Sequence, residues 1–264
     1  MVEPRRRRRA VRGAGWLSGS LRFAVALALA VAMVAPFIYM IVAGLPGAEQ
    51  ALRGSIGHFV MNSAIFSLAV VAGQVVTSAT AAYAFARLRF PGRDRLFLAY
   101  LAMLAVPVIL LVIPRFLMID ALGWVDSYAG LISTELVSIS GIFFLRQCFR
   151  AMPRDLEDAA RLEGAGEWTI FRRVVVPQAV PALSTLAVVA FAEQWRSFLW
   201  PLVAVRSSDM QVVEVGIAGL RGARELSGPD PMAGALVAAL PLLIFCLFGP
   251  KFFIRGIGIP AGLR

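Results

Sequence analysis

The chain has 264 residues, of which 59% are hydrophobic and only 16% are charged, and its mean hydropathy is +0.77. Soluble proteins average roughly 45–50% apolar and about 25% charged residues, so the composition excludes a soluble globular domain, a disordered chain and a small disulfide-stapled domain. The net charge of +10 does not indicate nucleic acid as a partner, because the basic residues lie between apolar runs and do not share a polar face. We expect an all-α integral membrane protein surrounded by lipid, because backbone groups in lipid must be satisfied internally.

Six segments hold enough apolar residues to cross a bilayer, which takes about 20. They cover residues 23–45, 59–86, 96–114, 128–149, 174–192 with an extension to about 205, and 232–250. The first follows an arginine-rich stretch, as in a secretory signal, but its 23 uncharged residues exceed the roughly 7–15 of a signal core. We therefore predict an uncleaved first span and six transmembrane helices.

The basic residues predict the orientation of the spans, because cytoplasmic loops carry an excess of arginine and lysine. The two ends and the connections after the second and fourth spans hold 20 basic residues, whereas the opposite connections hold four. Both termini are therefore expected in the cytoplasm of a multi-pass plasma-membrane protein. The core of the chain covers residues 59–255. It is flanked by a basic amino-terminal tail (1–22), a first helix with its outer loop (23–58) and a carboxyl-terminal tail (256–264).

The sequence lacks residues that nucleotide binding and metal catalysis require. A P-loop needs Gly-Lys-Ser/Thr, but the single lysine, Lys251, lies between Pro250 and Phe252. One histidine, His58, cannot supply an HExxH zinc site or another multi-histidine metal centre. We expect no catalytic residue, no metal and no cofactor in this chain.

The most informative segment is the connection between the fourth and fifth spans, residues 150–178. Asp155 can cap a helix, Gly164 can end it in a left-handed conformation, and a second short helix can follow. Ala159 and Ala160 leave a smooth face that another protein can approach closely. This connection is predicted to be a cytoplasmic docking element, the alternative being a solvated amphipathic hairpin on the membrane.

The same connection resembles the EAA loop of binding-protein-dependent ABC importer permeases, whose motif reads approximately E-A-A-x-x-x-G followed by I-x-L-P. Here the stretch reads E-D-A-A-R-L-E-G-A, with Pro177 downstream. The similarity starts near Phe59, runs through A-Y-A-F-A-R-L-R-F-P-G (82–92) and F-L-W-P-L (198–202), and favours the MalG-like branch of sugar importers. It implies the MetI-like fold, with a coupling (EAA) helix between the fourth and fifth spans.

By this resemblance the chain forms half of a pore and couples ATP hydrolysis by a partner to uptake of a carbohydrate or related solute. Its partners would be a homologous second permease, two ATP-binding subunits that hold ATP and magnesium, and an extracytoplasmic solute-binding protein. Asp158 would pair with an arginine of the ATPase, and Trp168, Ile170 and Phe171 would supply apolar anchors. Glu167 lies outside this expected contact, so its replacement by alanine should be mild. The predicted coupling residues are Glu157, Asp158, Ala159, Ala160, Gly164, Trp168, Phe171 and Pro177.

Polar residues inside the spans are candidates for the solute pathway, because charge in lipid is costly and usually faces a cavity or a partner. Glu193 and Arg196 are three residues apart and could instead pair with each other. Trp195 could stack on a sugar or anchor at the interface, and Asn62 could bond another helix. The pathway candidates are Asn62, Glu135, Glu193, Gln194, Trp195 and Arg196.

Other functions stay open at this point. A secondary transporter should show paired, interrupted helices in both halves, and no such repeat is visible in the sequence. A membrane-embedded enzyme needs a nucleophile–base or metal constellation, which one histidine does not supply. An ABC permease for glycerol phosphate, an amino acid or a peptide would share the EAA loop. Arg196 and Ser197 stand where the family usually has Asn and an acid, which leaves the solute undecided.

Overall fold

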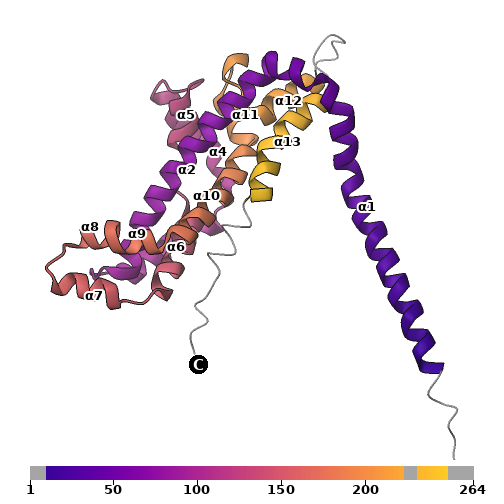
Figure 1. The fold of residues 1–264 in the computed structure, drawn as a ribbon. Coiled ribbons are helices and arrows are strands. Elements are labelled where there is room, and N and C mark those ends of the chain that lie inside the picture. Colours follow the sequence, from indigo (N-terminus) through magenta and orange to yellow (C-terminus); the bar gives the residue numbers. More distant parts are fainter. Residues whose placement is uncertain (1–9, 223–230, 249–264) are drawn as a thin grey trace, which may run out of the picture.

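The computed structural model describes residues 10–222 and 231–248, and the regular elements of these residues are all helical (Figure 1). They are α1 (Ala10–Arg53), α2 (Ser55–Arg87), α3 (Arg93–Ala102), η1 (Met103–Ala105), α4 (Val108–Ala121), α5 (Tyr128–Ser133), α6 (Ile139–Ala151), α7 (Asp155–Leu162), α8 (Glu167–Ile170), η2 (Phe171–Val175), α9 (Val176–Gln178), α10 (Val180–Trp195), α11 (Leu199–Ala204), η3 (Ser208–Met210), α12 (Val213–Gly222) and α13 (Pro231–Phe248). The prediction of an all-α membrane chain is confirmed. The predicted tail at 256–264 and residues 1–9 lie outside the described residues.

Two helices are long and apolar enough to cross a membrane alone, namely Leu21–Glu49 within α1, and α2. Four spans result if each of two bent pairs counts as one: α3 with α4, bent by 100°, and α8 to α9 with α10, bent by 75°. The predicted third and fifth spans are therefore not straight, and the predicted fourth is divided into α5 and α6. The count of six spans stays a prediction.

Prolines lie at both bends. Pro107 directly precedes α4, and Pro181 lies in the first turn of α10 beyond the bend at Ala179. Proline has no backbone N–H and interrupts a continuous helix, which makes these positions natural breaks. The fifth predicted span is interrupted again after Trp195, so its expected continuation to about 205 as one helix is wrong.

α2 is the central helix of the bundle, and it packs against α1, α5, α6, α10 and α12. It runs for 33 residues and contains no proline. Its approach to α6 is close, because a Cβ added to Gly141 would lie 2.8 Å from Ser78 Oγ. Small side chains at 77–82 permit this approach, so α2 and α6 behave as one packed unit.

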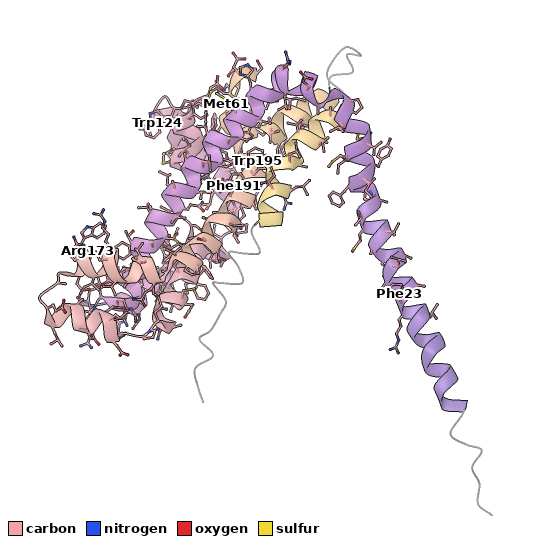
Figure 2. All side chains as sticks on the ribbon, viewed as in Figure 1. Phe23, Met61, Trp124, Arg173, Phe191 and Trp195 are labelled. Carbon is pink, nitrogen blue, oxygen red and sulfur yellow. The ribbon has the colours of Figure 1, made fainter. Side chains whose placement is uncertain are left out.

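The first helix stands apart from this bundle over most of its length and joins it near its carboxyl end, where it packs against α13 (Figure 1). Figure 2 places Phe23 on the separate part of α1 and shows Trp124 and Arg173 at opposite ends of the bundle. The helices α7 and α8 lie at the end marked by Arg173. The loop predicted to dock another protein therefore forms one end of the molecule.

Candidate functional site

The segment predicted to be the EAA loop (150–178), called the EAA loop below, contains two short helices, α7 and α8, as expected, followed by η2 and α9. At their junction Gly164 has a φ of +85°. The N–H groups of Gly164 and the next residue donate to the carbonyls of Arg161 and Ala160 at 3.0 and 2.9 Å, which is the Schellman pattern of a glycine-terminated helix. The predicted glycine stop is confirmed. The predicted cap is wrong, because Asp155 is the first residue of α7 and its acidic first turn complements the helix dipole instead.

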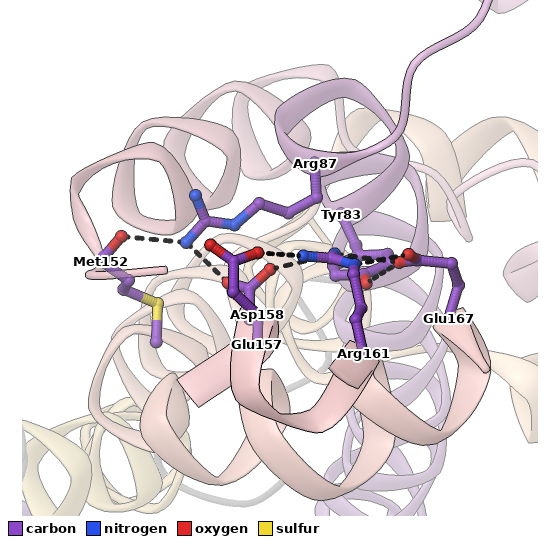
Figure 3. Close-up of polar contacts among 7 residues, drawn as sticks. All are labelled: Tyr83, Arg87, Met152, Glu157, Asp158, Arg161 and Glu167. Atoms are coloured by element: carbon purple, nitrogen blue, oxygen red, sulfur yellow. Dashed lines mark hydrogen bonds and ion pairs between the residues drawn. The ribbon is translucent and has the colours of Figure 1, made fainter. Parts of the chain in front are cut away.

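One side of α7 is joined to the end of α2 by a buried ion pair (Figure 3). The side chains of Arg87 and Glu157 are each 2% exposed, and Arg87 Nη2 lies 2.8 Å from Glu157 Oε1. The same Nη2 donates to the carbonyl of Met152 at 3.0 Å, while Glu157 Oε2 lies 3.6 Å from Arg161 Nη2. Removing one partner of a buried pair leaves an uncompensated charge and is strongly destabilising. The pair therefore fixes the position of α7 against α2.

A second set of contacts joins α2 to α8. The Tyr83 hydroxyl donates to Glu167 Oε2 at 2.5 Å, and Arg161 Nε donates to Glu167 Oε1 at 2.9 Å. The hydrogen bond to Glu167 raises the pKa of Arg161 above its ordinary value. The ring of Tyr83 packs against Phe171, with centroids 5.0 Å apart. Glu167 therefore connects α2, α7 and α8. Its replacement by alanine would break these contacts, so we no longer expect a mild effect.

The EAA loop also carries apolar and acidic side chains that its own chain leaves exposed. Leu162 is 91% exposed, Trp168 66% and Leu156 61%. The Asp158 side chain is 62% exposed and accepts a hydrogen bond from Arg161 at 2.8 Å. We call Leu156, Asp158, Leu162 and Trp168 the outward face. Large apolar side chains left exposed on one short loop are typical of an interaction site.

The remaining predicted coupling residues lie elsewhere on the loop. Ala159 and Pro177 are exposed, and Ala160 is half-buried against the core of the loop. Ile170 and Phe171 are 0% and 7% exposed and belong to the core shared with α2, α6 and α10. The expectation that these two side chains anchor a partner is wrong, because they face the bundle.

Two predicted pathway residues, Asn62 and Trp195, are engaged in contacts between helices. The Asn62 amide donates to two backbone carbonyls in and after η3 at 2.6 and 3.0 Å and accepts from the Tyr128 hydroxyl at 2.6 Å. The Trp195 indole N–H donates to the carbonyl of Ala238 at 2.9 Å, and its ring stacks on Phe191 (Figure 2). Asn62 therefore bonds other segments of the bundle, which is the alternative considered for it from the sequence, and Trp195 does the same. The polar groups of both side chains are used in these contacts.

Glu135 lies in the break between α5 and α6 and forms an ion pair with Arg115 of α4. Arg115 also donates to the Thr134 hydroxyl at 2.8 Å and lies 4.4 Å from the centre of the Trp200 ring. The carbonyl of Glu135 accepts from the Gln74 side chain at 2.8 Å. Backbone groups freed by a broken span need such partners, so these contacts stabilise the break.

The last three pathway candidates gather at the end of α10. Gln194 is buried, whereas Glu193 and Arg196 are exposed. The helix ends at Trp195, and the ion pairs found among the described residues do not include one between Glu193 and Arg196. The intrahelical pair considered from the sequence is therefore absent, and both side chains are open to a partner or a solute.

Sequence reasoning missed three members of the network at the EAA loop, Tyr83, Arg87 and Arg161. Arg87 was predicted only as an orientation charge. The available signal is the spacing of Tyr83 and Arg87, four residues apart at the end of an apolar span, which puts both on one helical face. A tyrosine and an arginine on one face need polar partners when that face is buried.

The described residues form a helical membrane bundle with a two-helix loop at one end and an exposed outward face on that loop. The same fold is known from a solved structure of a membrane transporter. A chain of a bacterial ABC transporter involved in the import of the acidic polysaccharide alginate has a TM-score of 0.78 to this structure, at 18% identity, over 95% of this chain and 100% of that one.

Residues 74–251 match the model of the family described as binding-protein-dependent transport system inner membrane component, and the chain belongs to this family. It is 32% identical over 198 residues to the arabinooligosaccharides transport system permease protein AraQ of Bacillus subtilis, covering 75% of this chain and 70% of AraQ. It is also 32% identical over 203 residues to the sn-glycerol-3-phosphate transport system permease protein UgpE of Pectobacterium atrosepticum, covering 76% and 72%. The chain is thus a membrane permease subunit of a multi-subunit transporter and is not itself an enzyme.

Proposed function

We propose that this chain forms one half of the pore of an ABC importer and that its EAA loop receives the driving motion from an ATPase. The observation that carries the proposal is the division of this loop into one side fixed to α2 and an outward face that its own chain leaves uncovered. A homologous second permease would complete the pore. Two ATP-binding subunits would dock at the EAA loop, and an extracytoplasmic binding protein would deliver the solute.

The outward face offers an ATPase three apolar anchors and one acid. Burying a side chain such as Leu162 contributes roughly 1.5–3 kcal/mol of binding free energy. Asp158, which is bonded to Arg161 and 62% exposed, could accept a second charged hydrogen bond from the partner, which would fix the register of α7 in the docking cleft. Closure of the ATPase would then move the EAA loop as a rigid body.

We place the EAA loop and both termini in the cytoplasm. The arginine distribution supports this orientation, and the exposed Arg172 and Arg173 of the loop lie at the same end of the bundle. The opposite end carries Trp124, a residue type enriched at membrane–water interfaces. ATP and magnesium would be held by the ATPase, since this chain has no Gly-Lys-Ser/Thr sequence.

We propose a carbohydrate or a related polyol phosphate as the solute. Relatives named for arabinooligosaccharides and for sn-glycerol-3-phosphate, each 32% identical, support this chemical class. Glu193 and Arg196 are the pathway candidates whose polar groups are exposed, and hydroxyl-rich solutes suit such hydrogen-bonding side chains. The wall of the pathway would be shaped by Asn62, Gln194 and Trp195. Glu135 would stabilise the break between α5 and α6 through its ion pair with Arg115.

The test is purification of the complete complex from its own membranes. Mass spectrometry identifies the ligand retained by the binding protein, and ATP hydrolysis in proteoliposomes is measured with and without that loaded protein. We expect an ATPase to copurify and the loaded binding protein to stimulate hydrolysis. A complex that contains no ATPase would contradict the importer role, whereas a retained amino acid or peptide would contradict the carbohydrate assignment alone.

A further inference from the structure

Three residues, 152–154, join α7 to α6, which packs on α2. Beyond this link, the chain offers two routes by which motion of α7 could reach the membrane spans. The covalent route continues through α8 into α10. It passes the π-helical segment η2 and then a 75° bend at Ala179. Single π-helical turns and bends of this kind are places where helices deform. The covalent route is therefore not a continuous helix, and its buried residues Phe171, Val175 and Ala179 pack in the core shared with α2.

The other route runs through side chains into α2. Arg87 Nη2 lies 2.8 Å from Glu157 Oε1, with both side chains 2% exposed, and the Tyr83 hydroxyl donates to Glu167 at 2.5 Å (Figure 3). Tyr83 and Arg87 are four residues apart and lie on one face of α2. From this face Arg87 contacts α7 and Tyr83 contacts α8, so the loop is attached at two points. Arg161 connects the two points, because its Nη2 lies 3.6 Å from Glu157 Oε2 and its Nε donates to Glu167 Oε1 at 2.9 Å.

Stability alone does not explain a buried ion pair in this position. Well-packed apolar residues of the same volume are often equally or more stabilising than a buried pair, and the best-attested use of such pairs is to specify register. Here the pair defines a single register between α7 and the last turn of α2. The helix that the pair contacts, α2, has no proline in its 33 residues to kink it, and it packs against α6 and α10.

We propose that the EAA loop drives the bundle through α2 and not through its chain continuation into α10, and that Tyr83, Arg87, Glu157 and Glu167 are positioning residues for coupling. This inference rests on the proposed function. These four side chains do not form the surface that meets the ATPase. They make α7 and α8 a rigid extension of α2, so a displacement imposed on the outward face is delivered to the centre of the bundle.

The experiment measures solute transported per ATP hydrolysed in the reconstituted complete complex, at matched membrane levels. Tyr83→Phe removes one hydroxyl and keeps the ring on Phe171, and the paired replacement Arg87→Met with Glu157→Leu removes both charges without leaving either unpaired. Each should keep the ATPase bound and hydrolysing while transport per ATP falls about five- to tenfold, the size expected when contacting groups are uncoupled. Glu163→Gln, an exposed acid at the end of α7, is the matched control and should leave the ratio unchanged.

A variant that loosens the covalent route separates the two routes. Ala179→Gly adds flexibility at the bend and should leave transport per ATP unchanged. The inference is overturned if Ala179→Gly lowers the ratio as much as Tyr83→Phe does, or if the Tyr83 and Arg87–Glu157 variants transport at the normal ratio. Loss of ATPase binding in these variants would also overturn it, because they would then act on docking. If the unaltered complex binds no ATPase, the proposed function falls and this inference falls with it.

Discussion

Leu162→Ala isolates the contribution of the outward face, because this side chain has almost no neighbours in its own chain. Leu162 is 91% exposed, so its truncation should change the free energy of unfolding by no more than about 0.5 kcal/mol. If an ATPase buries it, the loss of its outer carbons removes about 0.8 kcal/mol each, or roughly 2.4 kcal/mol of binding free energy. Because about 1.4 kcal/mol is a factor of ten, the Kd should rise about 50-fold.

The assay is titration of the purified ATPase onto the permease pair in lipid nanodiscs, with the Kd measured for each variant at one salt concentration. Leu29→Ala is the control, since Leu29 is also exposed but lies on the separate part of α1. We expect its Kd to equal that of the unaltered chain. An unchanged Kd for Leu162→Ala would show that this side chain stays outside the contact, and the outward face would lose its role as the dock.

Substitutions at three further positions have defined outcomes. Gly164→Leu should destabilise the EAA loop by about 1–2 kcal/mol through its left-handed backbone alone, because an added Cβ meets nothing within 4 Å; Gly164→Asn should cost less, and uptake at matched levels ranks the two. Asp158→Lys should weaken ATPase binding by about 1.5–3 kcal/mol by removing a charged hydrogen bond, as measured by copurification, without lowering membrane insertion. Asp126→Ala should lower thermal stability by about 1 kcal/mol, because the carboxylate accepts from the N–H of Arg206 and from the N–H and hydroxyl of Ser207. The Ser207 N–H lowers the pKa of Asp126, so the hydrogen-bond part of this difference should be present above about pH 4 and be lost as the pH falls through the depressed value. The cost of placing alanine at the positive φ of residue 126 stays at every pH.

The helical membrane fold could be predicted from the sequence because its cause is compositional. Long uncharged runs can be solvated only by lipid or by protein, and spanning backbone must then be helical. The breaks could not be predicted, since hydropathy averages over the bend at Ala179 and over residues 134–138 without registering backbone direction. Prolines gave a partial signal at both bends of the predicted third and fifth spans.

The site was predictable in its location and less so in its orientation. The role of Gly164 was predicted correctly, because α7 ends in a left-handed residue and glycine adopts that conformation without strain. The two neighbouring acids, Glu157 and Asp158, look equivalent in sequence. They differ because α7 turns about 100° per residue, which buries Glu157 on Arg87 and leaves Asp158 outside. Phe171 lies in η2 and is buried because this segment packs on Tyr83 of α2, a contact that the sequence does not show.

The central claim is that the outward face meets an ATPase on the cytoplasmic side. A cysteine at position 162, in a chain whose Cys148 and Cys246 are replaced by alanine, tests it with a membrane-impermeant maleimide. We predict labelling in inside-out vesicles stripped of the ATPase, protection when the purified ATPase is added back, and no labelling in right-side-out vesicles. Labelling of position 162 from the outside of right-side-out vesicles would contradict the claim.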